Sequence, residues 1–571
     1  MYTIFSSFSN GLSDNERLPE GKDNSSDRSN WLFSKRYFIY TIVSNIINHF
    51  KYHYILLSWN LHLCAVFVEK ILRIQPEIQK MYLLLRASNT QCAEERLQNE
   101  VFKIDLFRVL RERWGENFSS FISKKVVTIA GDVAKENLGI KDEKLKNDMF
   151  EEIDFLVHFA ASTKFNERFD ILMDVNTKGA LNVLNIAKNC RRLKAFGHIS
   201  TGKFHFLSLY ILMIQLFLVN NFNTNILTSL DIYSLIILAY VCGDAKDGHG
   251  ILQEKPFEMG QSLKKDSKLD IHKEMDLIKR KLAELQAMNV DENSMKCVMQ
   301  DYGMERANFH GWPNTYTFTK AMGEMLLMHK KDNVPLIIIR PTMITSTRKD
   351  PFPGWIEGLR TIDSMIYGYG HGKIKFFLGN PNTIMDAIPA DMVINCVMTA
   401  IFFHSNEPPK NFIYHISSSL RNPIKSSDLH NICHHYFMKT PCINQNGKPI
   451  IISKGIVVNS FAAFNIFMII RFVLLLMVLN LVNKICRNSF KDVYDNQSRK
   501  FRVLQHLAKL YKPYAYFNSI FDDTNVEILR MATKVNLKTK NDELDFDPTS
   551  FDWKDYMMNI HIPGLLKYHK K

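Results

Sequence analysis

The chain has 571 residues, 46% of them hydrophobic and 23% charged, a composition typical of a globular protein with two or more domains. Its 72 Lys and Arg against 58 Asp and Glu give a formal charge of +14, which indicates first a solvated basic surface and also suits phosphorylated small molecules or an anionic membrane face. No stretch combines dense Lys and Arg with aromatic residues, which argues against nucleic acid as a partner. Nine scattered cysteines without a Cys-x-x-Cys pair indicate neither a disulfide scaffold nor a zinc site, and no metal is expected.

Three apolar segments approach, but do not reach, the roughly 20 apolar residues that a membrane-spanning helix needs. They are Phe204–Asn220, Ile226–Val241 and Phe461–Val482, the last of which is interrupted by polar residues. We expect none of them to span a membrane, and the third is a candidate for lying on a membrane surface.

Short apolar runs alternate with helical patterns from about residue 66 onward. The runs KMYLLLRA, KKVVTIAGD, DFLVHFAAS and LKAFGHIST are predicted strands, and VFVEKILRIQ, EERLQNEVFKIDLFRVLRERWG and VNTKGALNVLNIAKNC are predicted helices, the second ending at Gly115. Continuous apolar strands between helices indicate a parallel sheet that is covered on both faces. The predicted fold class is therefore α/β, a doubly wound, Rossmann-like parallel sheet, in which ligands gather at the carboxyl ends of the strands.

The same alternation resumes after an interruption, with the helix TYTFTKAMGEMLLMHKK and the strand VPLIIIRPTMIT. The charged stretch Asp266–Gln300 is predicted to be an exposed helical excursion. Beyond about residue 425 the pattern changes, and we expect a second, mostly helical domain at 426–571 after a sheet domain at 65–425.

Tyr316 and Lys320 lie four residues apart on a predicted helix and therefore share one of its faces. A tyrosine phenol has a pKa of about 10, and a nearby ammonium group favours its phenolate. The pair is thus suited to give a proton to a carbonyl oxygen while hydride reaches the carbon, and Lys320 can also hold the ribose hydroxyls of a nicotinamide cofactor. A Tyr-x-x-x-Lys match also arises by chance about once in a chain with 21 Tyr, so the position of this helix after the fifth strand carries the assignment.

Other candidate residues stand at the ends of predicted strands. Ser200 and Thr201 close one strand, where a hydroxyl either bonds the same carbonyl oxygen or caps a turn. Arg86 closes the strand YLLLR and either pairs with the 2′-phosphate of NADP or is simply solvated. The small Ala160 and Ala161 end a further strand, where they either let a cofactor approach the backbone or only pack closely.

Several longer segments resemble one family. VTIAGDVAKENLGI, FLVHFAASTKFNERFD, DVNTKGALNVLNIAKNC, TYTFTKAMGEML, IIIRPTMITSTRKDPFPGWIEGLRTIDS and DAIPADMVINCVM are similar to the alcohol-forming fatty acyl-CoA reductases of plants, which belong to the extended short-chain dehydrogenase/reductases. FDWKDYMMNIHIPGLLKY is similar to the end of their second domain. The similarity covers residues 65–571 apart from one interruption. These long segments and the C-terminal domain disfavour a nucleotide-sugar epimerase or dehydratase, which shares the Tyr–Lys pair.

The resemblance implies reduction of a long-chain fatty acyl-CoA, or of an acyl carrier protein thioester, to a primary alcohol with two NADPH. It implies that Tyr316 is the acid, Lys320 its partner, and Thr201 or Ser200 the oxyanion donor. It also implies a role in wax, suberin or other lipid metabolism, a peripheral membrane contact, and the cytoplasmic face of the endoplasmic reticulum, with the plastid as the alternative. The implied cofactor contacts are Arg86, Asp132, Val133, His158, Ala160, Ala161, Asn176, Tyr316, Lys320, Pro341 and Thr342.

The chain departs from the family in two places. The family's first strand runs into a Gly-x-x-Gly-x-x-Gly turn, whereas the matching HYILLSWNLHLCAVFVEKILR has no glycine to let a pyrophosphate approach bare backbone. Deleting the nearly uncharged Gly202–Leu238 restores the family's continuous reading, HIST–AYVCGD.

Our hypothesis is that 202–238 is a translated intron and that residues 1–64, expected to be disordered or wrongly predicted, replace a lost first exon. A loop that inserts into a membrane is the alternative explanation of 202–238. Because the glycine turn is missing, a catalytically inactive chain that binds at most a lipid or a partner is the second functional hypothesis.

Overall fold

The computed structural model describes residues 53–57, 61–162, 167–200, 250–359, 361–374, 376–405, 412–458, 473–486, 490–498, 519–534 and 544–569, together with Ile466 and Phe501. Residues 1–52 and 201–249 lie outside the described residues. With them lie Thr201, the interruption at 202–238, and the apolar runs Phe204–Asn220 and Ile226–Val241.

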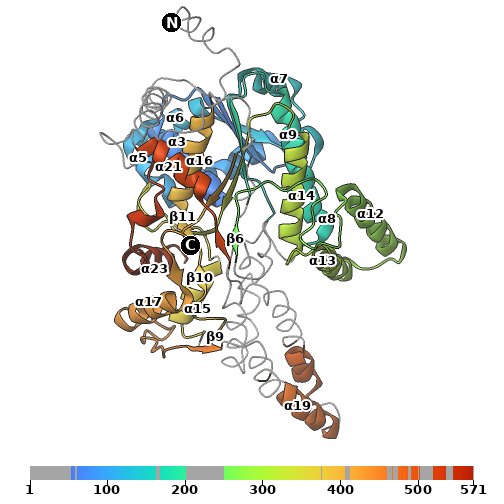
Figure 1. The fold of residues 1–571 in the computed structure, drawn as a ribbon. Coiled ribbons are helices and arrows are strands. Elements are labelled where there is room, and N and C mark those ends of the chain that lie inside the picture. The colour runs from blue at the N-terminus through green and yellow to red at the C-terminus, as the bar shows by residue number, and fades with distance from the viewer. Residues whose placement is uncertain are drawn as a thin grey trace, which may run out of the picture.

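A seven-stranded parallel sheet forms the centre of the molecule, in the order β12-β7-β5-β4-β1-β2-β3 (Figure 1). Its strands are β1 (His53–Leu57), β2 (Lys80–Leu85), β3 (Val126–Ala130), β4 (Phe155–His158), β5 (Ala195–Ile199), β7 (Leu336–Pro341) and β12 (Phe412–Ile416). Every strand expected from the apolar runs is present, and the doubly wound fold is confirmed. β1 lies between β2 and β4, so the sheet includes residues that precede the expected domain start at residue 65.

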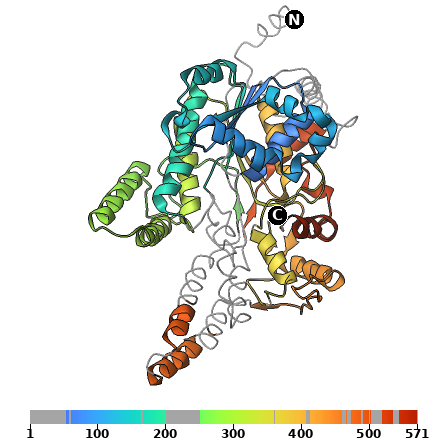
Figure 2. The same cartoon turned by 180° about the vertical axis from the view of Figure 1, so that it is seen from behind.

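Helices cover both faces of this sheet (Figures 1 and 2). One face carries α3 (Leu61–Ile74) and α16 (Ala390–His404), and the other carries α9 (Gly179–Asn189) and α14 (Thr315–Lys330). The two faces bury separate apolar clusters, because successive side chains of a strand point to opposite sides of the sheet.

The single helix expected to end at Gly115 is broken into pieces. It consists of α4 (Thr90–Arg96), a π-helical turn at Leu97–Phe102, a short turn at Asp105–Phe107 and α5 (Arg108–Trp114). Ile104 is extended between them, and Arg111 Nη1 donates to the carbonyls of Phe102 and Ile104 at 2.6 and 3.0 Å. The break is therefore stabilised because the carbonyl oxygens freed from the helix find a half-buried donor. Gly115 does end α5, at a φ of +50°.

The expected helical excursion is confirmed as two helices, α12 (Ile271–Ala287) and α13 (Glu292–Phe309). They project beside α14, away from the sheet (Figure 1). Asp270 and Asp291 cap their first turns by accepting backbone N–H groups. The pair is less exposed than expected, because its apolar side packs with α14 in a third cluster around Met299, Trp312 and Phe318.

The C-terminal part returns to the sheet. Its described helices are α17 (Ser426–Lys439), α19 (Leu474–Ile485), α21 (Thr524–Lys534), α22 (Trp553–Tyr556) and α23 (Ile562–Tyr568). Helix α21 packs on β12 and α16, and the short β15 (Ile520–Phe521) pairs with β6 (Ile251–Leu252). Among the described residues, no helix combines the length and apolar character that crossing a membrane requires.

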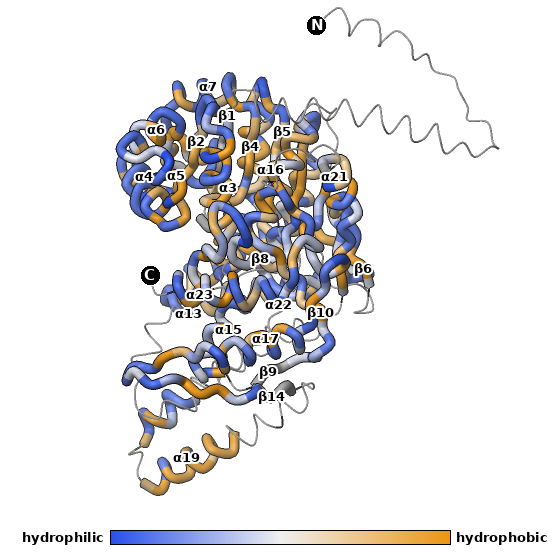
Figure 3. The backbone as a smooth tube through the Cα atoms, turned by 90° about the vertical axis from the view of Figure 1, so that its left-hand side faces the viewer, coloured by the Kyte–Doolittle hydropathy of each residue, from blue (hydrophilic) through white to orange (hydrophobic). Residues whose placement is uncertain are grey.

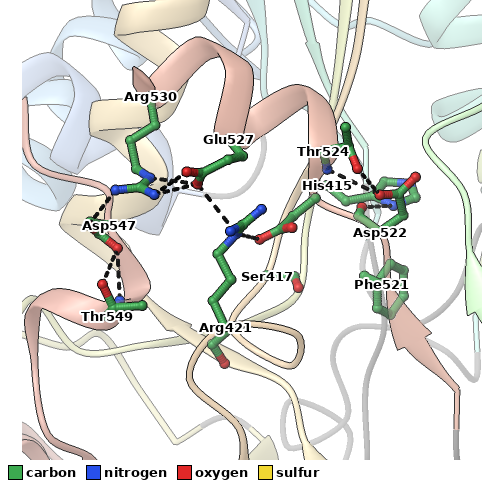
Figure 4. A network of polar contacts seen from close by, with 12 residues as sticks. His415, Ser417, Arg421, Phe521, Asp522, Thr524, Glu527, Arg530, Asp547 and Thr549 are labelled. Atoms are coloured by element: carbon green, nitrogen blue, oxygen red, sulfur yellow. Dashed lines mark hydrogen bonds and ion pairs between the residues drawn. The ribbon is translucent and has the colours of Figure 1, made fainter. Parts of the chain in front are cut away.

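Ion pairs fasten α21 to the loop that follows β12 (Figure 4). Arg421 Nε lies 2.7 Å from Asp523 Oδ2 and 3.4 Å from Glu527 Oε2. Arg530 continues the chain of charges by pairing with Glu527 and with Asp547. Asp523 is buried, and burial raises the pKa of its carboxyl, so its charge depends on Arg421.

We expect Arg421→Ala to lower the free energy of unfolding by about 3 kcal/mol, because it leaves a buried carboxylate without its cation. Arg191→Ala is the matched control: Arg191 also lies 2.7 Å from its partner, Glu151, but both side chains are exposed. That control should cost less than about 1 kcal/mol. Urea denaturation of both variants measures the difference, and equal losses would contradict this account of the docking.

Candidate active site

Tyr316 and Lys320 lie on the first turns of α14, close to the end of β5. Asn314 caps the helix, with its Oδ1 accepting the N–H of Thr317 at 2.8 Å. Both Tyr316 and Lys320 are buried, and Lys320 Nζ donates to the carbonyl oxygen of Ile199 at 3.2 Å. Burial lowers the pKa of Lys320 to about 8, and the nearby Glu324 opposes this shift. The structure therefore brings this predicted pair to the carboxyl end of the central strands.

Asn176 connects α14 to the loop after β4. It lies on a π-helical turn, Met173–Lys178, which leads into α9. Its Oδ1 accepts the N–H of Ser162 at 2.9 Å, and its Nδ2 donates to Thr319 Oγ1 at 3.1 Å. Gly323 permits this close approach, since a Cβ there would lie 2.5 Å from the carbonyl oxygen of Asn176. The small Ala160 and Ala161 directly precede Ser162 and are buried, so Asn176 fixes their loop beside α14.

Ser200 faces a buried carboxylate. Its hydroxyl donates to Glu324 Oε1, while its N–H donates to the carbonyl of Ile339 at 2.7 Å. Because its proton is already engaged, Ser200 is the poorer of the two expected oxyanion donors. Thr201, the other one, lies outside the described residues.

Glu324 and Arg340 form a buried ion pair that was not predicted from the strand ends. Arg340 Nη2 lies 2.6 Å from Glu324 Oε2, and its Nη1 donates to His415 Nε2 and to the carbonyl of Lys255, each at 3.1 Å. Two signals in the sequence could have found it. Glu324 is four residues after Lys320 on the same helical face, and Arg340 interrupts the apolar strand LIIIRP.

His415 continues this network toward the C-terminal part of the chain. Burial and the adjacent Arg340 hold the pKa of its imidazole well below the usual value, so the ring is neutral. Since Nε2 accepts from Arg340, Nδ1 must carry the hydrogen and donate to the carbonyl of Asp522, 3.1 Å away. Glu254 accepts the N–H groups of His415 and Asn525, and burial raises its pKa to about 8. Residues on both sides of the interruption thus meet at Arg340, namely Ser200 through Glu324 and Lys255 directly.

The ring of His158 faces that of His198 on the neighbouring strand, with 2.9 Å between their Nδ1 atoms. Burial and Lys320 lower the pKa of His158 to about 3, and the pKa of His198 is also well below its usual value. Both rings are therefore neutral, and one Nδ1 donates its hydrogen to the other. The two rings form an uncharged, buried surface near Lys320. The expected contact of His158 with a cofactor stays a prediction.

A cavity of about 1310 Å³ lies beside the edge strand β3, at the other end of the candidate cofactor site. Its lining includes Arg86, Asp132, Lys135 and Lys141. Arg86 is more than half exposed, and its Nε lies 3.3 Å from Asp132 Oδ2. The cavity therefore offers several cations where an adenosine phosphate would lie in a sheet of this type.

The remaining predicted contacts are Val133, Pro341 and Thr342. Val133 is buried, and its carbonyl accepts from Asn182 Nδ2 at 2.9 Å. Pro341 ends β7, and the hydroxyl of Thr342 donates to the carbonyl of Ile416 at 3.2 Å. These residues are placed at strand ends as expected, while their roles remain predictions.

A nicotinamide dinucleotide fits two of the three parts of this site. The cationic cavity suits its adenosine end, and the buried Tyr316 and Lys320 suit its nicotinamide end. Between them β1 ends at Leu57 and α3 begins at Leu61, so a strand is still followed closely by a helix. The turn itself, 58–60, lies outside the described residues and contains no glycine. The residues present therefore fit the cofactor except at its pyrophosphate.

Two family models match this chain. An NAD-binding family model described as "Male sterility protein" matches residues 62–397, and a second model with the same description matches residues 471–571. Among solved structures, a reductase domain of a nonribosomal peptide synthetase from Mycobacterium tuberculosis is 14% identical, with a TM-score of 0.49 and coverage of 93% of this chain and 95% of that one.

Curated relatives are considerably more similar. Fatty acyl-CoA reductase 1 of Arabidopsis thaliana is 45% identical over 507 residues, which cover 89% of this chain and 95% of the relative. The alcohol-forming fatty acyl-CoA reductase of Simmondsia chinensis is 43% identical, with coverage of 89% and 94%. Given these identities over nearly the whole length, the chain belongs to the fatty acyl-CoA reductase family.

Proposed function

We propose that this chain reduces a long-chain fatty acyl thioester, acyl-CoA or acyl carrier protein thioester, to a primary fatty alcohol with two NADPH. The observation that carries this proposal is the buried Tyr316–Lys320 pair at the carboxyl end of β5. The membership of the chain in the fatty acyl-CoA reductase family supports it.

The cofactor, when bound, supplies one hydride to the carbonyl carbon in each of two reductions. Tyr316 donates a proton to the carbonyl oxygen as negative charge develops there, and the Lys320 cation stabilises the resulting phenolate. Thr201 is proposed as the hydrogen-bond donor to the same oxygen. The first reduction gives a hemithioacetal, which loses the thiol to become an aldehyde, and the second converts the aldehyde to the alcohol.

NADPH is proposed over NADH because of Arg86. A guanidinium at the end of the second strand pairs with a 2′-phosphate, whereas NAD sites usually place a carboxylate there. The guanidinium lies beside Asp132, and Lys135 and Lys141 line the same cavity.

We place this activity at the cytoplasmic face of the endoplasmic reticulum, in the formation of wax, suberin or related lipids. The basic charge of the chain supports this address, because cytoplasmic leaflets are anionic. The plastid is the alternative, since a relative that is 33% identical bears the name "Fatty acyl-CoA reductase 2, chloroplastic".

A chain that retains the fold without catalysis is the second candidate. The observation in its favour is the turn at 58–60, where the family's glycines are missing. Backbone that carries large side chains there keeps the pyrophosphate from its N–H donors.

These candidates are separated by comparing the chain as it stands with a repaired chain, in which 202–238 is removed and a glycine-rich turn replaces 58–60. We expect the repaired chain to bind NADPH and form fatty alcohol, and the original chain to do both much more weakly. Calorimetry measures the binding, and chromatography of the lipid products measures the alcohol. In the repaired chain, Tyr316→Phe should lower kcat by about 10²–10⁴-fold without weakening NADPH binding. A repaired chain that binds NADPH without yielding alcohol would refute the proposed activity.

The pH dependence of catalysis should report on Lys320. With its pKa lowered to about 8, the ammonium is lost as pH rises through 8, so kcat/KM should fall on the alkaline side from that value. Glu324→Gln removes the carboxylate that raises this pKa, and the alkaline limb should therefore move to lower pH. Glu274→Gln is the matched control, because Glu274 is also buried against an arginine, Arg306, but lies on α12. A limb that stays in place in Glu324→Gln would rule out this role for Glu324.

Arg86→Ala should raise the KM for NADPH by about 10–100-fold, because one charge-assisted hydrogen-bond pair to the 2′-phosphate is lost. The KM for NADH should not change. Arg113→Ala, which alters an exposed arginine outside the cavity, serves as control. Steady-state kinetics with both cofactors, in whichever of the two chains binds NADPH, checks the prediction, and equal losses with NADH would contradict it.

A further inference from the structure

Two side chains near the C-terminus contact the segment that continues β7. Tyr556 ends α22, and His561 ends the π-helical turn that leads into α23. Their partners are Thr345, the last residue of β8 (Met343–Thr345), and Ser346, which follows it. All four side chains are buried, and α22 and α23 lie beside β8 (Figure 3). The C-terminal part therefore contacts a segment that starts at the candidate active site.

The hydroxyl of Tyr556 binds both residues at the end of β8. It donates to the carbonyl oxygen of Ser346 at 2.8 Å, and it lies 2.8 Å from Thr345 Oγ1 and 3.1 Å from Ser346 Oγ. Because the single phenolic hydrogen goes to the carbonyl, the phenolic oxygen accepts from the hydroxyl of Thr345. Burial raises the pKa of Tyr556, so the phenol keeps this hydrogen. Among the described residues, the other donor to the Ser346 carbonyl is the N–H of Ala390, 3.4 Å away.

His561 binds the amide of Ser346 and a carboxylate. Its Nδ1 lies 3.4 Å from the backbone nitrogen of Ser346 and 3.1 Å from Ser346 Oγ. A backbone N–H only donates, so Nδ1 is the acceptor and Nε2 carries the hydrogen. Nε2 lies 3.1 Å from Oδ1 of Asp363, a buried residue on α15 (Thr361–Gly370). The carboxylate therefore stabilises the tautomer in which the ring accepts from Ser346.

Ser346, His561 and Asp363 place a hydroxyl, an imidazole and a carboxylate in series, as in a nucleophilic triad. A nucleophile must reach the carbonyl carbon of its substrate, whereas Ser346 is 0% exposed. Its hydroxyl also lies between Tyr556 and His561, which already satisfy it. The arrangement therefore holds the backbone at Ser346 and does not attack a substrate.

The backbone held in this way leads directly from the nicotinamide end of the candidate site. Thr342, a predicted cofactor contact, precedes β8, and its N–H donates to the carbonyl of Ile416 at 3.0 Å. In the described part of the chain, β8 pairs with one strand, β11 (Ala387–Pro389), outside the central sheet. A pair of three-residue strands contributes little stability alone, so the end of β8 depends on Tyr556 and His561.

We propose that Tyr556 and His561 are positioning residues, which hold the backbone from Thr342 to Ser346 where the nicotinamide end of the cofactor needs it. The proposal rests on the proposed function, and it gives the C-terminal part of the chain a role in hydride transfer. A shift of this segment would move Thr342 relative to Tyr316, and small misplacements of bound reactants slow a reaction strongly.

Hydrogen exchange in the full chain as it stands tests whether the segment is held. Tyr556→Phe removes the hydroxyl and keeps the ring, so the backbone amides of 342–347 should exchange about tenfold faster. Tyr568→Phe is the matched control, because the Tyr568 hydroxyl also fastens the C-terminal part but does so elsewhere, by donating to Asp105 Oδ2 at 2.6 Å. Mass spectrometry of peptides measures the exchange, and thermal unfolding verifies that both variants are folded. Unchanged exchange in Tyr556→Phe, or an equal gain in Tyr568→Phe, would overturn the proposal.

The contact of His561 has its own pair of variants. His561→Asn keeps an acceptor near the position of Nδ1, whereas His561→Leu, of similar size, has none. Both lose the imidazole beside Asp363, so the difference between them isolates the bond to Ser346. Exchange at 342–347 should be about tenfold faster in His561→Leu than in His561→Asn. Equal rates would show that His561 does not hold this backbone.

Cofactor binding tests the consequence for the site, in whichever of the original and repaired chains binds NADPH. The probes are NADPH and 2′-phospho-ADP-ribose, which lacks the nicotinamide. Tyr556→Phe should weaken NADPH binding about tenfold and leave the nicotinamide-free probe unchanged, as measured by calorimetry. A residue that only stabilises the fold would affect both probes alike, so equal losses would contradict the positioning role, as would absence of NADPH binding in both chains.

Turnover provides the last readout. In Tyr556→Phe the kcat for fatty alcohol should fall by about 10–100-fold, while the KM for the acyl thioester stays unchanged, because the substrate is bound but the hydride donor is misplaced. Exchange and probe binding are measured without turnover. A repaired chain that binds NADPH but forms no alcohol would therefore refute the proposed activity alone, whereas unchanged exchange in Tyr556→Phe would refute the positioning role alone.

Discussion

The buried ion pair between Glu324 and Arg340 is the interaction on which the candidate site depends. A charge removed from water is tolerated only when its partners satisfy it, and breaking such a pair costs more than the pair contributes. Here the partners come from β5 through Ser200, from the segment after the interruption through Lys255, and from β12 through His415. The position of α14, and with it Tyr316 and Lys320, is therefore fixed by electrostatics as well as by apolar packing.

Local sequence patterns predicted the strands and the Tyr316–Lys320 pair, but not the contacts between distant residues. The strands were predictable because they are continuous apolar runs such as LIIIRP, and the pairing of Tyr316 with Lys320 followed from helical spacing. The break at Ile104 was not, since the apolar pattern continues through it and only the three-dimensional position of Arg111 satisfies the freed carbonyls. Nor did the sequence indicate that Ser200 donates to Glu324, because that contact joins residues 124 positions apart.

The two ends of the candidate cofactor site have the side chains expected of the family, whereas the segment between them does not. The nicotinamide end keeps its buried side chains, and the adenosine end keeps its cations. Residues 58–60, which link β1 to α3, include none of the glycines that close backbone approach requires. Packing of the sheet does not depend on residues 58–60, so the fold is kept although these residues include no glycine.

The pairing of β6 with β15 also determines when the site can form during synthesis. Glu254 accepts the N–H of Asn525, a residue 271 positions further along the chain. Contacts between residues this far apart in sequence form late in folding. During synthesis, the earlier residue of each pair stays unpaired until the later one has been made. The segment that follows the interruption, and the Arg340 network it completes, therefore cannot be finished until the ribosome has translated residue 525. A nascent chain that stops before residue 525 could form the sheet, but the hydrogen-bond network at the candidate active site would be incomplete.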